Sequence, residues 1–489
     1  MAFKNFKVET DADGIALLTW DIPGRSMNVL DETTINELGE IVKQTTADAA
    51  VKGVVVTSGK EAFSAGADLS MLEGMNRRYA ELLKAKSEVA ANQMLFDESR
   101  KSSLVFRAIE TCGKPWAAAI NGLALGGAFE LTLSCHYRVA AENPKIRLGL
   151  PEAKVGLFPG AGGTQRVPRI VPPQDAMQLL LKGETVNIEK AKALKLIDAI
   201  VPSGDLIKAA KDWIKGGGKA VAPWDDKNFK LPGGPVYSKA GMMMFPAGNA
   251  IYRRETYDNY PAQRAIMSCV YEGLQLPIDA ALRVESRYFT QVLRSKEAAA
   301  MIRSLFLSMQ ELNKGARRPQ HVPPTKVKKL AVIGAGFMGA SVGYVSARAG
   351  IEVALIDRDQ ESADKGKGHA KAVIDDLIKK GRAKASDSEA ILSRITATAD
   401  YDVLKDCDLI IEAVFEDRKV KAETYAKAQP LLKGDAIFAS NTSTLPINSL
   451  AEEFKDQGKF IGIHFFSPVE KMMLVEIIVG KNTGDVALA

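Results

Sequence analysis

The feature that most constrains the fold of this chain is a glycine-rich turn, GAGFMG at residues 334–339, in a particular setting. An apolar run at 329–333 precedes the turn as a strand pattern, and a helix pattern follows it. Gly334 suits a tight turn, Gly336 lets a diphosphate approach the backbone, and Gly339 lets the helix pack closely on the strand. Because a GxGxxG sequence is informative between a strand and a helix, this setting predicts a Rossmann unit that binds a dinucleotide.

Asp357 indicates which dinucleotide this unit binds. It ends the next strand pattern, 353–356, eighteen residues after Gly339. A carboxylate at this place accepts hydrogen bonds from the adenine ribose and repels a 2′-phosphate, so the sequence favours NAD over NADP. Arg358 points the other way because it is able to bind a phosphate, although a charged residue after a strand is more often simply exposed.

A second glycine-rich stretch lies in the first half of the chain, within residues 120–169. A strand pattern ends there at a turn, and the pair Gly126-Gly127 then precedes a helix pattern with Glu130 in its first turn. The free N–H groups and the positive dipole end of a helix N-terminus suit an oxygen that becomes negative during a reaction, and glycine allows close approach. The Gly127 N–H is therefore a candidate oxyanion-hole donor.

Glu152 provides a second carboxylate in the same stretch, after Pro151 and another apolar run. Two carboxylates near one opening suit general acid–base chemistry. A purely structural interpretation stays open on the local pattern, in which Glu130 improves the first turn of its helix and Pro151-Glu152 begins another helix.

The composition is that of an ordinary globular chain. A length of 489 residues predicts two to four domains, and hydrophobic and charged fractions of 46% and 25% are typical. The net charge of +6 is spread along the chain without a basic run, which favours an anionic small molecule over nucleic acid as the ligand. The four cysteines lack CxxC spacing, so we expect neither disulfides nor a metal site. No signal segment or membrane span is apparent, and a cytoplasmic location is expected.

Strand and helix patterns alternate through about residue 202 and again after about residue 325. This alternation predicts α/β layers with sites on the turns. Residues 203–325 differ, because most of their patterns are helical. The stretch 315–329 has the composition of a linker, and the domain boundary is expected within it, near 325. We therefore expect domains at 1–202 and 326–489, joined by a helical linker region at 203–325.

Polar residues follow several strand patterns of the C-terminal part, where open α/β sheets bind their ligands. The run SNTS at 440–443 follows one strand, and HFFSP at 464–468 lies at the end of another. His464 is able to take a proton from an alcohol, and Glu476 on the next strand is able to orient the imidazole. A hydrogen-bonded structural histidine beside a surface glutamate is an equally good interpretation of the pattern alone.

Residues 120–169, together with FSAGADL at 63–69, resemble the crotonase superfamily of enoyl-CoA hydratases and isomerases. The resemblance implies an α/β spiral of repeated ββα units over residues 1–202 and a coenzyme A thioester as the substrate. It also implies that the N–H groups of Ala67 and Gly127 hold the thioester oxygen. The two catalytic glutamates of the superfamily match Glu130 and Glu152.

Residues 326–480 resemble the NAD-binding domain of the 3-hydroxyacyl-CoA dehydrogenases, a doubly wound parallel sheet. The resemblance implies that His464 and Glu476 are the catalytic pair and that Ser443 contacts the substrate hydroxyl. Ser467 stands where that family has an asparagine, which puts the contact of that asparagine in doubt. The positions that the resemblance assigns to NAD binding are Gly334, Gly336, Phe337, Met338, Gly339, Asp357, Ala413, Glu416, Lys421 and Asn441.

Both resemblances, in this order, make essentially the whole chain similar to the α subunits of bacterial fatty-acid β-oxidation complexes. They imply hydration of a trans-2-enoyl-CoA to a 3-hydroxyacyl-CoA, followed by NAD-dependent oxidation to a 3-ketoacyl-CoA, in a hetero-oligomer with a thiolase β subunit. Because that family continues beyond the point where this chain ends, we expect a truncated dehydrogenase half that oxidises slowly or not at all. Two alternatives stay open, namely an enoyl-CoA isomerase and a C-terminal half that only binds NAD or serves assembly.

Overall fold

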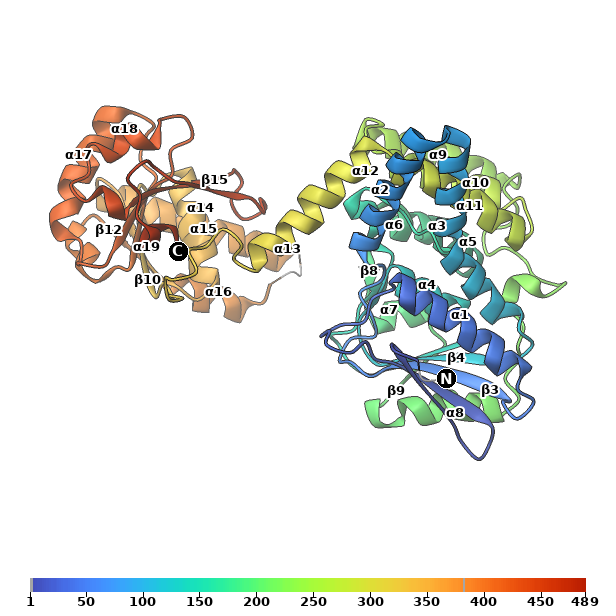
Figure 1. The fold of residues 1–489 in the computed structure, drawn as a ribbon. Helices are drawn as coiled ribbons and strands as arrows, with labels where there is room; N and C mark the ends of the chain where they lie inside the picture. Colours follow the sequence, from blue (N-terminus) through green and yellow to red (C-terminus); the bar gives the residue numbers. More distant parts are fainter. Residues whose placement is uncertain (1–2, 381–382) are drawn as a thin grey trace. The chain divides into compact units, whose positions relative to one another are not determined.

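The chain folds as two compact units, Met1–Asn313 and Lys314–Ala489 (Figure 1). The structure is a computed structural model that describes residues 3–380 and 383–489. Residues 1–2, at the start of the expected first domain, lie outside the described residues. The expected linker region, 203–325, is divided between the units, because its helices belong to the first and its last residues to the second.

The first unit is built on a six-stranded sheet that is parallel except for a hairpin at one edge. Gly14 adopts a φ of +79° in the hairpin turn. The strand order is β1 (Phe6–Thr10), β2 (Ile15–Trp20), β3 (Gly53–Ser58), β4 (Trp116–Ile120), β6 (Tyr137–Ala141) and β9 (Ala199–Val201). A smaller sheet holds β5 (Ala124–Leu125), β7 (Leu148–Gly149) and β8 (Thr185–Val186).

Two successive turns of a ββα repeat carry three of the four candidate hydratase residues, Gly127, Glu130 and Glu152. In the first, β4 of the large sheet is followed by β5 of the small sheet and then by helix α4 (Gly127–Ser134). In the second, β6 and β7 are followed by the 3-10 helix η1 (Pro151–Val155) and by α5 (Gly163–Ile170). The repeat places the starts of α4 and η1 beside each other, because β5 and β7 are hydrogen-bonded neighbours. This is the crotonase-like spiral that the sequence predicted.

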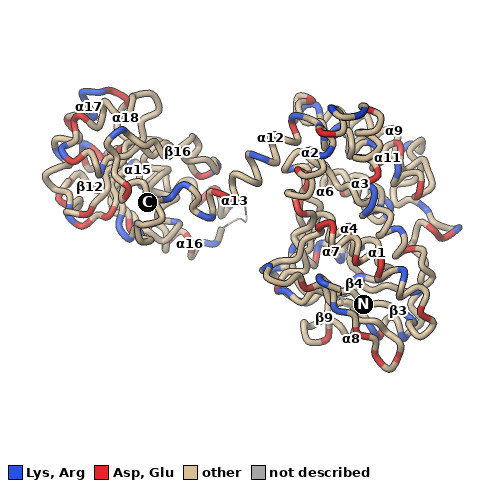
Figure 2. Tube along the Cα trace, in the orientation of Figure 1, with Lys and Arg blue, Asp and Glu red and all other residues tan. Residues whose placement is uncertain are grey.

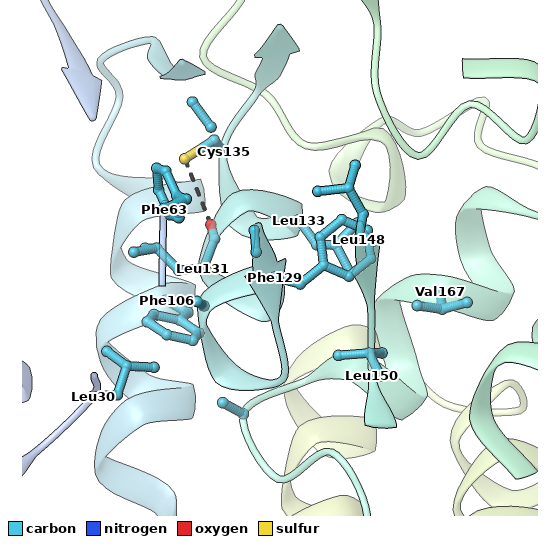
Figure 3. Packing of buried hydrophobic residues seen from close by; sticks show 14 of the residues in the cluster. Leu30, Phe63, Phe106, Phe129, Leu131, Leu133, Cys135, Leu148, Leu150 and Val167 are labelled. Atoms are coloured by element: carbon cyan, nitrogen blue, oxygen red, sulfur yellow. Dashed lines mark hydrogen bonds between the residues drawn. The ribbon is translucent and has the colours of Figure 1, made fainter. Parts of the chain in front are cut away.

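Helix α4 lies inside the first unit, and all eight of its residues are buried. Phe129, Leu131 and Leu133 point from it toward different neighbours, as Figure 3 shows. The Cys135 thiol donates to the Leu131 carbonyl oxygen at 3.5 Å. Because the helix has no solvent-facing side, its single carboxylate is also forced into the interior.

Helices cover the two sheets of the first unit on both sides. Asp31 is the N-cap of α1, and its carboxylate accepts from the Thr34 N–H. Phe245, Ile266 and Phe289, from the expected linker region, are buried in the same core as the sheet. The helices are α1 (Glu32–Ala47), α2 (Leu69–Ala85), α3 (Glu88–Thr111), α6 (Pro173–Leu181), α7 (Ile188–Ala193), α8 (Leu206–Lys215), α9 (Lys239–Thr256), α10 (Pro261–Gly273), α11 (Ile278–Leu293), α12 (Lys296–Ile302), the π-helical η4 (Arg303–Leu307) and α13 (Ser308–Asn313).

The second unit is a seven-stranded sheet, parallel except for its last strand. Alternate residues of β10 point to opposite faces, so that Leu330 and Val332 join one buried cluster while Ala331 and Ile333 join another. The strand order is β12 (Ile395–Thr398), β11 (Glu352–Ile356), β10 (Lys329–Ile333), β13 (Leu409–Glu412), β14 (Ile437–Ser440), β15 (Phe460–Phe465) and β16 (Val475–Ile478). The helices are α14 (Phe337–Arg348), α15 (Gln360–Lys379), α16 (Ala385–Leu392), α17 (Arg418–Ala428), α18 (Ile447–Ala451) and α19 (Asp485–Leu488).

A core on both faces makes this a doubly wound sheet, which confirms the Rossmann prediction. The order of the strands reverses at β10, and the loops that leave β10 and β13 flank that point. Such a switch point is where open α/β sheets bind ligands. Basic and acidic residues are interspersed along the described part of each unit (Figure 2). No helix of the described residues has the length and apolar character that crossing a membrane requires.

Candidate active sites

A cavity of about 780 Å³ lies at the N-terminus of α4 in the first unit. The four residues that the sequence assigned to this chemistry all line it, and they come from the loop before α2, from the start of α4 and from η1. The wall of the cavity is largely apolar, and Met71, Leu157 and Phe306 provide part of it. The four expected site residues are Ala67, Gly127, Glu130 and Glu152.

Two glycines with left-handed backbones bring the loop before α2 against the start of α4. Gly66 has a φ of +97° and Gly126 a φ of +55°. A Cβ at Gly66 would lie 2.7 Å from the Leu125 carbonyl oxygen, and a Cβ at Gly126 would lie 2.9 Å from Oε1 of Glu152. The approach at Gly66 is to main chain and requires glycine, whereas at Gly126 it is the left-handed backbone that favours glycine.

The Ala67 and Gly127 amides lie together at the cavity wall. A Cβ built on Gly127 would lie 3.9 Å from the Ala67 nitrogen. Among the described residues, neither amide donates to a protein acceptor, and no side chain caps the N-terminus of α4. Two free N–H groups at one point of an apolar wall can receive an oxygen that gains negative charge, with the helix dipole adding to the effect.

Glu130 is buried, with 2% of its surface exposed, and it faces the cavity from the first turn of α4. Its Oε1 accepts from the Ala161 N–H at 2.9 Å and from the Gly163 N–H at 2.6 Å. Burial raises the pKa of Glu130 to about 7, while these two N–H groups and the charge of Arg166 act in the opposite direction. The Glu130 carboxyl group therefore titrates near neutral pH.

Glu152 faces the same cavity with fewer partners. Its Oε2 is shielded from solvent and has no hydrogen-bond partner among the described residues. Burial, and then the charges of Glu130 and Glu285, raise the pKa of Glu152 well above its ordinary value. The environments of the two carboxyl groups therefore differ. Two N–H donors stabilise the ionised form of Glu130, and no such pair of donors in the described part of the chain stabilises the ionised form of Glu152.

Glu285 is a third carboxyl group beside this site, and the sequence reasoning missed it. It lies on α11, is fully buried, and accepts from the Gly162 N–H at 2.5 Å and from the Thr164 N–H at 3.0 Å. The Thr164 hydroxyl also donates to it. Its signal in the sequence is a charged residue within an otherwise apolar helix stripe that includes Leu282 and Phe289.

A buried ion pair supports the loop from the other side. Nε of Arg166 lies 2.6 Å from Oε1 of Glu110, and both side chains are fully buried. Nη1 of Arg166 donates to the Ala161 carbonyl oxygen at 2.7 Å. The loop that holds Glu130 is thus held by α3, α5 and α11 together.

The predicted glycine turn of the second unit connects β10 to α14. Gly334 has a φ of +102°, and its Cβ would lie 2.5 Å from the Ala413 carbonyl oxygen. A Cβ at Gly339 would overlap the Gly334 carbonyl oxygen, whereas a Cβ at Gly336 would meet nothing within 4 Å. The turn therefore packs tightly at its first and third glycines and is open at the second, which fits the approach of a pyrophosphate.

Asp357 lies beside this turn at the end of β11. Its Oδ2 accepts from the Ala335 N–H at 2.7 Å, and its Oδ1 accepts from the Arg358 N–H at 2.7 Å. The Arg358 side chain is 84% exposed and pairs with Asp359 at 3.1 Å. An acidic group at the turn and an outward-facing arginine fit NAD better than NADP. Phe337 and Met338 begin α14, where Phe337 is exposed and Met338 half-buried.

A buried lysine organises the loops after β13 and β14. Nζ of Lys421 lies 2.7 Å from Oε1 of Glu412 and 3.2 Å from Oε2 of Glu416. Burial tends to raise the pKa of Glu416, but hydrogen bonds from Thr442, Thr444 and Ser443 and the charge of Lys421 lower it to about 2. Glu412, which the sequence analysis did not single out, is the fully buried carboxylate of this network. It also accepts from the Tyr425 hydroxyl at 3.0 Å.

His464 and Glu476 are directly opposite each other on β15 and β16. Nδ1 of His464 lies 2.8 Å from Oε2 of Glu476, and within residues 3–380 and 383–489 the other ring nitrogen has no hydrogen-bond partner, so it can face a ligand. Asn441 joins this neighbourhood, because its Oδ1 accepts from the Phe465 N–H at 2.9 Å. Ser443 is exposed, and its N–H donates to Glu416 at 2.9 Å, so it belongs to the loop after β14.

The fold and sites define a chain that joins a crotonase-like unit to an NAD-binding Rossmann unit. Residues 10–216 match the enoyl-CoA hydratase/isomerase family, and residues 329–489 match the NAD-binding domain of 3-hydroxyacyl-CoA dehydrogenase.

Two curated relatives match 99% of the chain. These are the fatty acid oxidation complex subunits alpha of Shewanella frigidimarina and Shewanella amazonensis, each 35% identical. The matches cover 66% and 67% of those proteins. The chain belongs to the family of fatty acid oxidation complex α subunits and spans about two thirds of their length.

Two solved structures are similar to part of the chain. The (S)-3-hydroxybutyryl-CoA dehydrogenase of Ralstonia eutropha is 34% identical over 33% of this chain and 58% of that one, with a TM-score of 0.33. An enoyl-CoA hydratase of Bacillus anthracis is 24% identical over 64% of this chain and 96% of that one, with a TM-score of 0.37.

Proposed function

We propose that the first unit adds water to trans-2-enoyl-CoA thioesters. The observation that carries this proposal is the meeting of one buried and one half-buried carboxyl group with two N–H groups that have no protein acceptor among the described residues, all at one apolar cavity. In the proposed reaction, Ala67 and Gly127 donate to the thioester oxygen. They stabilise the enolate as negative charge develops on that oxygen.

The two glutamates take different roles in the proposed reaction. Glu130, whose anion is stabilised by the Ala161 and Gly163 N–H groups, removes a proton from water as the oxygen attacks carbon 3. Glu152, whose neutral form is favoured, gives its proton to carbon 2 as the enolate collapses. The protons balance. Glu130 releases the proton that it gained to solvent, and Glu152 takes up a new proton from solvent. Raised and unequal proton affinities in two neighbouring carboxyl groups support such a division.

The direct test incubates the purified chain with a trans-2-enoyl-CoA and follows the loss of enoyl absorbance. We expect hydration without any added cofactor. Unchanged absorbance, in protein whose circular dichroism shows a folded state, would refute the assignment. The alternative of an isomerase needs proton transfer between carbons but no attack by water, and two carboxyl groups at one cavity favour the hydratase. Product analysis by mass separates them, because hydration adds the mass of one water.

For the second unit we propose NAD-dependent oxidation of the 3-hydroxyacyl-CoA. The residues that would hold NAD are the open glycine turn at Gly336, the uncapped N-terminus of α14 and Asp357. Bound NAD supplies the acceptor for the hydride that leaves carbon 3. His464 takes the hydroxyl proton at its free ring nitrogen, while Glu476 fixes the imidazole orientation and stabilises its positive charge. We further propose that Ser443 contacts the substrate hydroxyl and that Asn441 helps to place the ligands.

Calorimetry with NAD and the appearance of NADH with a 3-hydroxyacyl-CoA test the two parts of this proposal separately. NAD binding without NADH formation would favour the rival interpretation, in which this unit only binds NAD or serves assembly. We also propose that the chain works in the cytoplasm in a complex with a thiolase β subunit, since its relatives are named as subunits of a complex. Co-purification from a cytoplasmic fraction tests the partner and the location together.

A further inference from the structure

The loop after η1 divides its main-chain amides between two carboxylates. Its four consecutive N–H groups, at residues 161–164, alternate: Ala161 and Gly163 donate to Glu130, while Gly162 and Thr164 donate to Glu285. Gly162 adopts a φ of +113°, which lets adjacent amides point in opposite directions. The orientation of one set of amides therefore fixes that of the other.

Glu285 comes from α11, outside the segment 10–216 that matches the hydratase family. Both of its oxygens are satisfied by donors, because Oε1 accepts from Gly162 and Oε2 accepts from the N–H and hydroxyl of Thr164. Three donors and no acceptor facing this group suit a carboxylate rather than an amide or an apolar side chain. A purely apolar residue on this helix face would leave the loop amides buried without acceptors.

The charge of Glu285 also reaches the reacting groups. The titratable and charged groups that face it are Glu130 on α4, Glu152 on η1, Arg166 and Arg169 on α5 and Cys269 on α10. Burial, and then the charge of Glu130, raise the pKa of Glu285 to about 8, and the ionised form of Glu285 in turn raises the pKa of Glu152, whose proton the proposed hydration uses. Glu285 thus acts on the site in two ways, by geometry through the loop and by charge through the cavity wall.

We propose that Glu285 is a positioning residue for hydration, which orients the loop at 161–164 so that Glu130 is held for attack on the substrate. The inference rests on the proposed hydratase function. Glu285 touches no reacting atom, since the loop amides lie between it and Glu130. The hydratase site is then completed by a residue from the helical region that follows the spiral.

The test compares Glu285→Gln with the parent chain and with Glu272→Gln as a matched control. Glu272 is on the adjacent helix α10, and it pairs with Arg287 and Tyr288 away from the cavity. In Glu285→Gln the amide nitrogen meets donors instead of acceptors, so we expect kcat to fall by about 10–100-fold with little change in KM, because a misplaced base costs rate up to about 10²-fold. The control keeps the parent values.

The pH dependence of kcat/KM is a second measurement, and it would not change if Glu285 had only a structural role. Removing the negative charge of Glu285 lowers the pKa of Glu152, so the acid loses its proton at a lower pH. The alkaline limb of kcat/KM should therefore move to lower pH in Glu285→Gln. Glu285→Asp keeps the charge on a shorter side chain, so it should lower kcat while leaving the alkaline limb in place. It also serves as the second variant if the glutamine variant fails to fold.

Amide hydrogen exchange on the unliganded chain tests the loop independently of activity. We expect faster exchange at residues 161–164 in Glu285→Gln than in the parent and the control. Unchanged exchange together with an unchanged pH profile would overturn the proposal. If the parent chain fails to hydrate enoyl-CoA, the proposed function fails by itself, and the exchange result still decides whether Glu285 positions the loop.

Discussion

At the scale of single residues, the chemistry of the first unit depends on which carboxyl group holds a proton. Glu130 is buried and Glu152 half-buried against one cavity. Glu130 accepts from the Ala161 and Gly163 N–H groups, whereas Oε2 of Glu152 has no partner among the described residues. Replacing either by glutamine keeps the size and removes the acid–base function. We expect Glu130→Gln and Glu152→Gln each to lower the hydration rate by about 10²–10⁴-fold. Steady-state assays at saturating substrate measure this, and full activity in either variant would contradict the assignment.

The pKa of Glu152 also predicts how stability depends on pH. Burial, followed by its acidic neighbours, raises the folded-state pKa above the ordinary value of 4.5. A carboxyl group with a raised folded-state pKa makes its full contribution to the free energy of unfolding below pH 4.5, where it is protonated. That contribution is lost as the pH rises through the folded-state pKa. Glu152→Gln removes that loss, so its melting temperature should exceed the parent value near pH 8 and approach it near pH 4. A melting difference that grew on acidification would contradict the sign.

Asp357 has two roles in the second unit that a single substitution removes together. Its carboxylate accepts from Ala335 in the glycine turn, and it is the group proposed to receive the ribose hydroxyls. Because hydrogen bonds to a charged group contribute about 1.5–3 kcal/mol, Asp357→Ala should weaken NAD binding by roughly 10–100-fold. Calorimetry measures this, with Glu361→Ala as the control for loss of a nearby exposed charge. Tighter binding of NADP than of NAD by the parent chain would refute the cofactor assignment.

At the scale of elements, the closeness of α14 to its preceding strand depends on Gly339. A Cβ there would overlap the Gly334 carbonyl oxygen, which is main chain and cannot rotate away. We expect Gly339→Ala to destabilise the second unit by about 1–3 kcal/mol and to weaken NAD binding. Gly368→Ala on α15 is the matched control, since its Cβ meets nothing within 4 Å and alanine favours a helix by about 0.5–1 kcal/mol. Denaturant melts of both variants settle the comparison.

Elements with strong local signals could be predicted from the sequence. The glycine turn at 334–339 and the Rossmann strands were predicted, since turn chemistry and apolar runs are local. Glu285 and Glu412 were not, because a buried carboxylate shows its partners only after folding brings distant segments together. The partners of Glu285 lie more than a hundred residues earlier in the chain. The roles of the site residues that the resemblance supplied remain predictions.

At the scale of the whole molecule, each unit has its own core. The sheet and helices of the first unit share one buried cluster, while the second has a cluster on each face of its sheet. A ligand that binds one unit should therefore stabilise that unit. At a hundred times its Kd, NAD should add about 2.7 kcal/mol to the unfolding free energy of the second unit and leave the first unchanged. Differential scanning calorimetry with and without NAD checks this, and a uniform shift of all transitions would contradict it.

The divided loop at 161–164 has a consequence for anyone who exchanges parts between related enzymes. A chimera cut at residue 216 would pair the loop of one parent with the α11 of the other, and Glu285 would meet amides that it was not matched to. Phe289 adds a second constraint, since a Cβ at Gly160 would lie 2.6 Å from its ring. A transplant of the first unit should therefore include α11, as the compact unit Met1–Asn313 does, so that the loop at 161–164 stays with the helix that holds it.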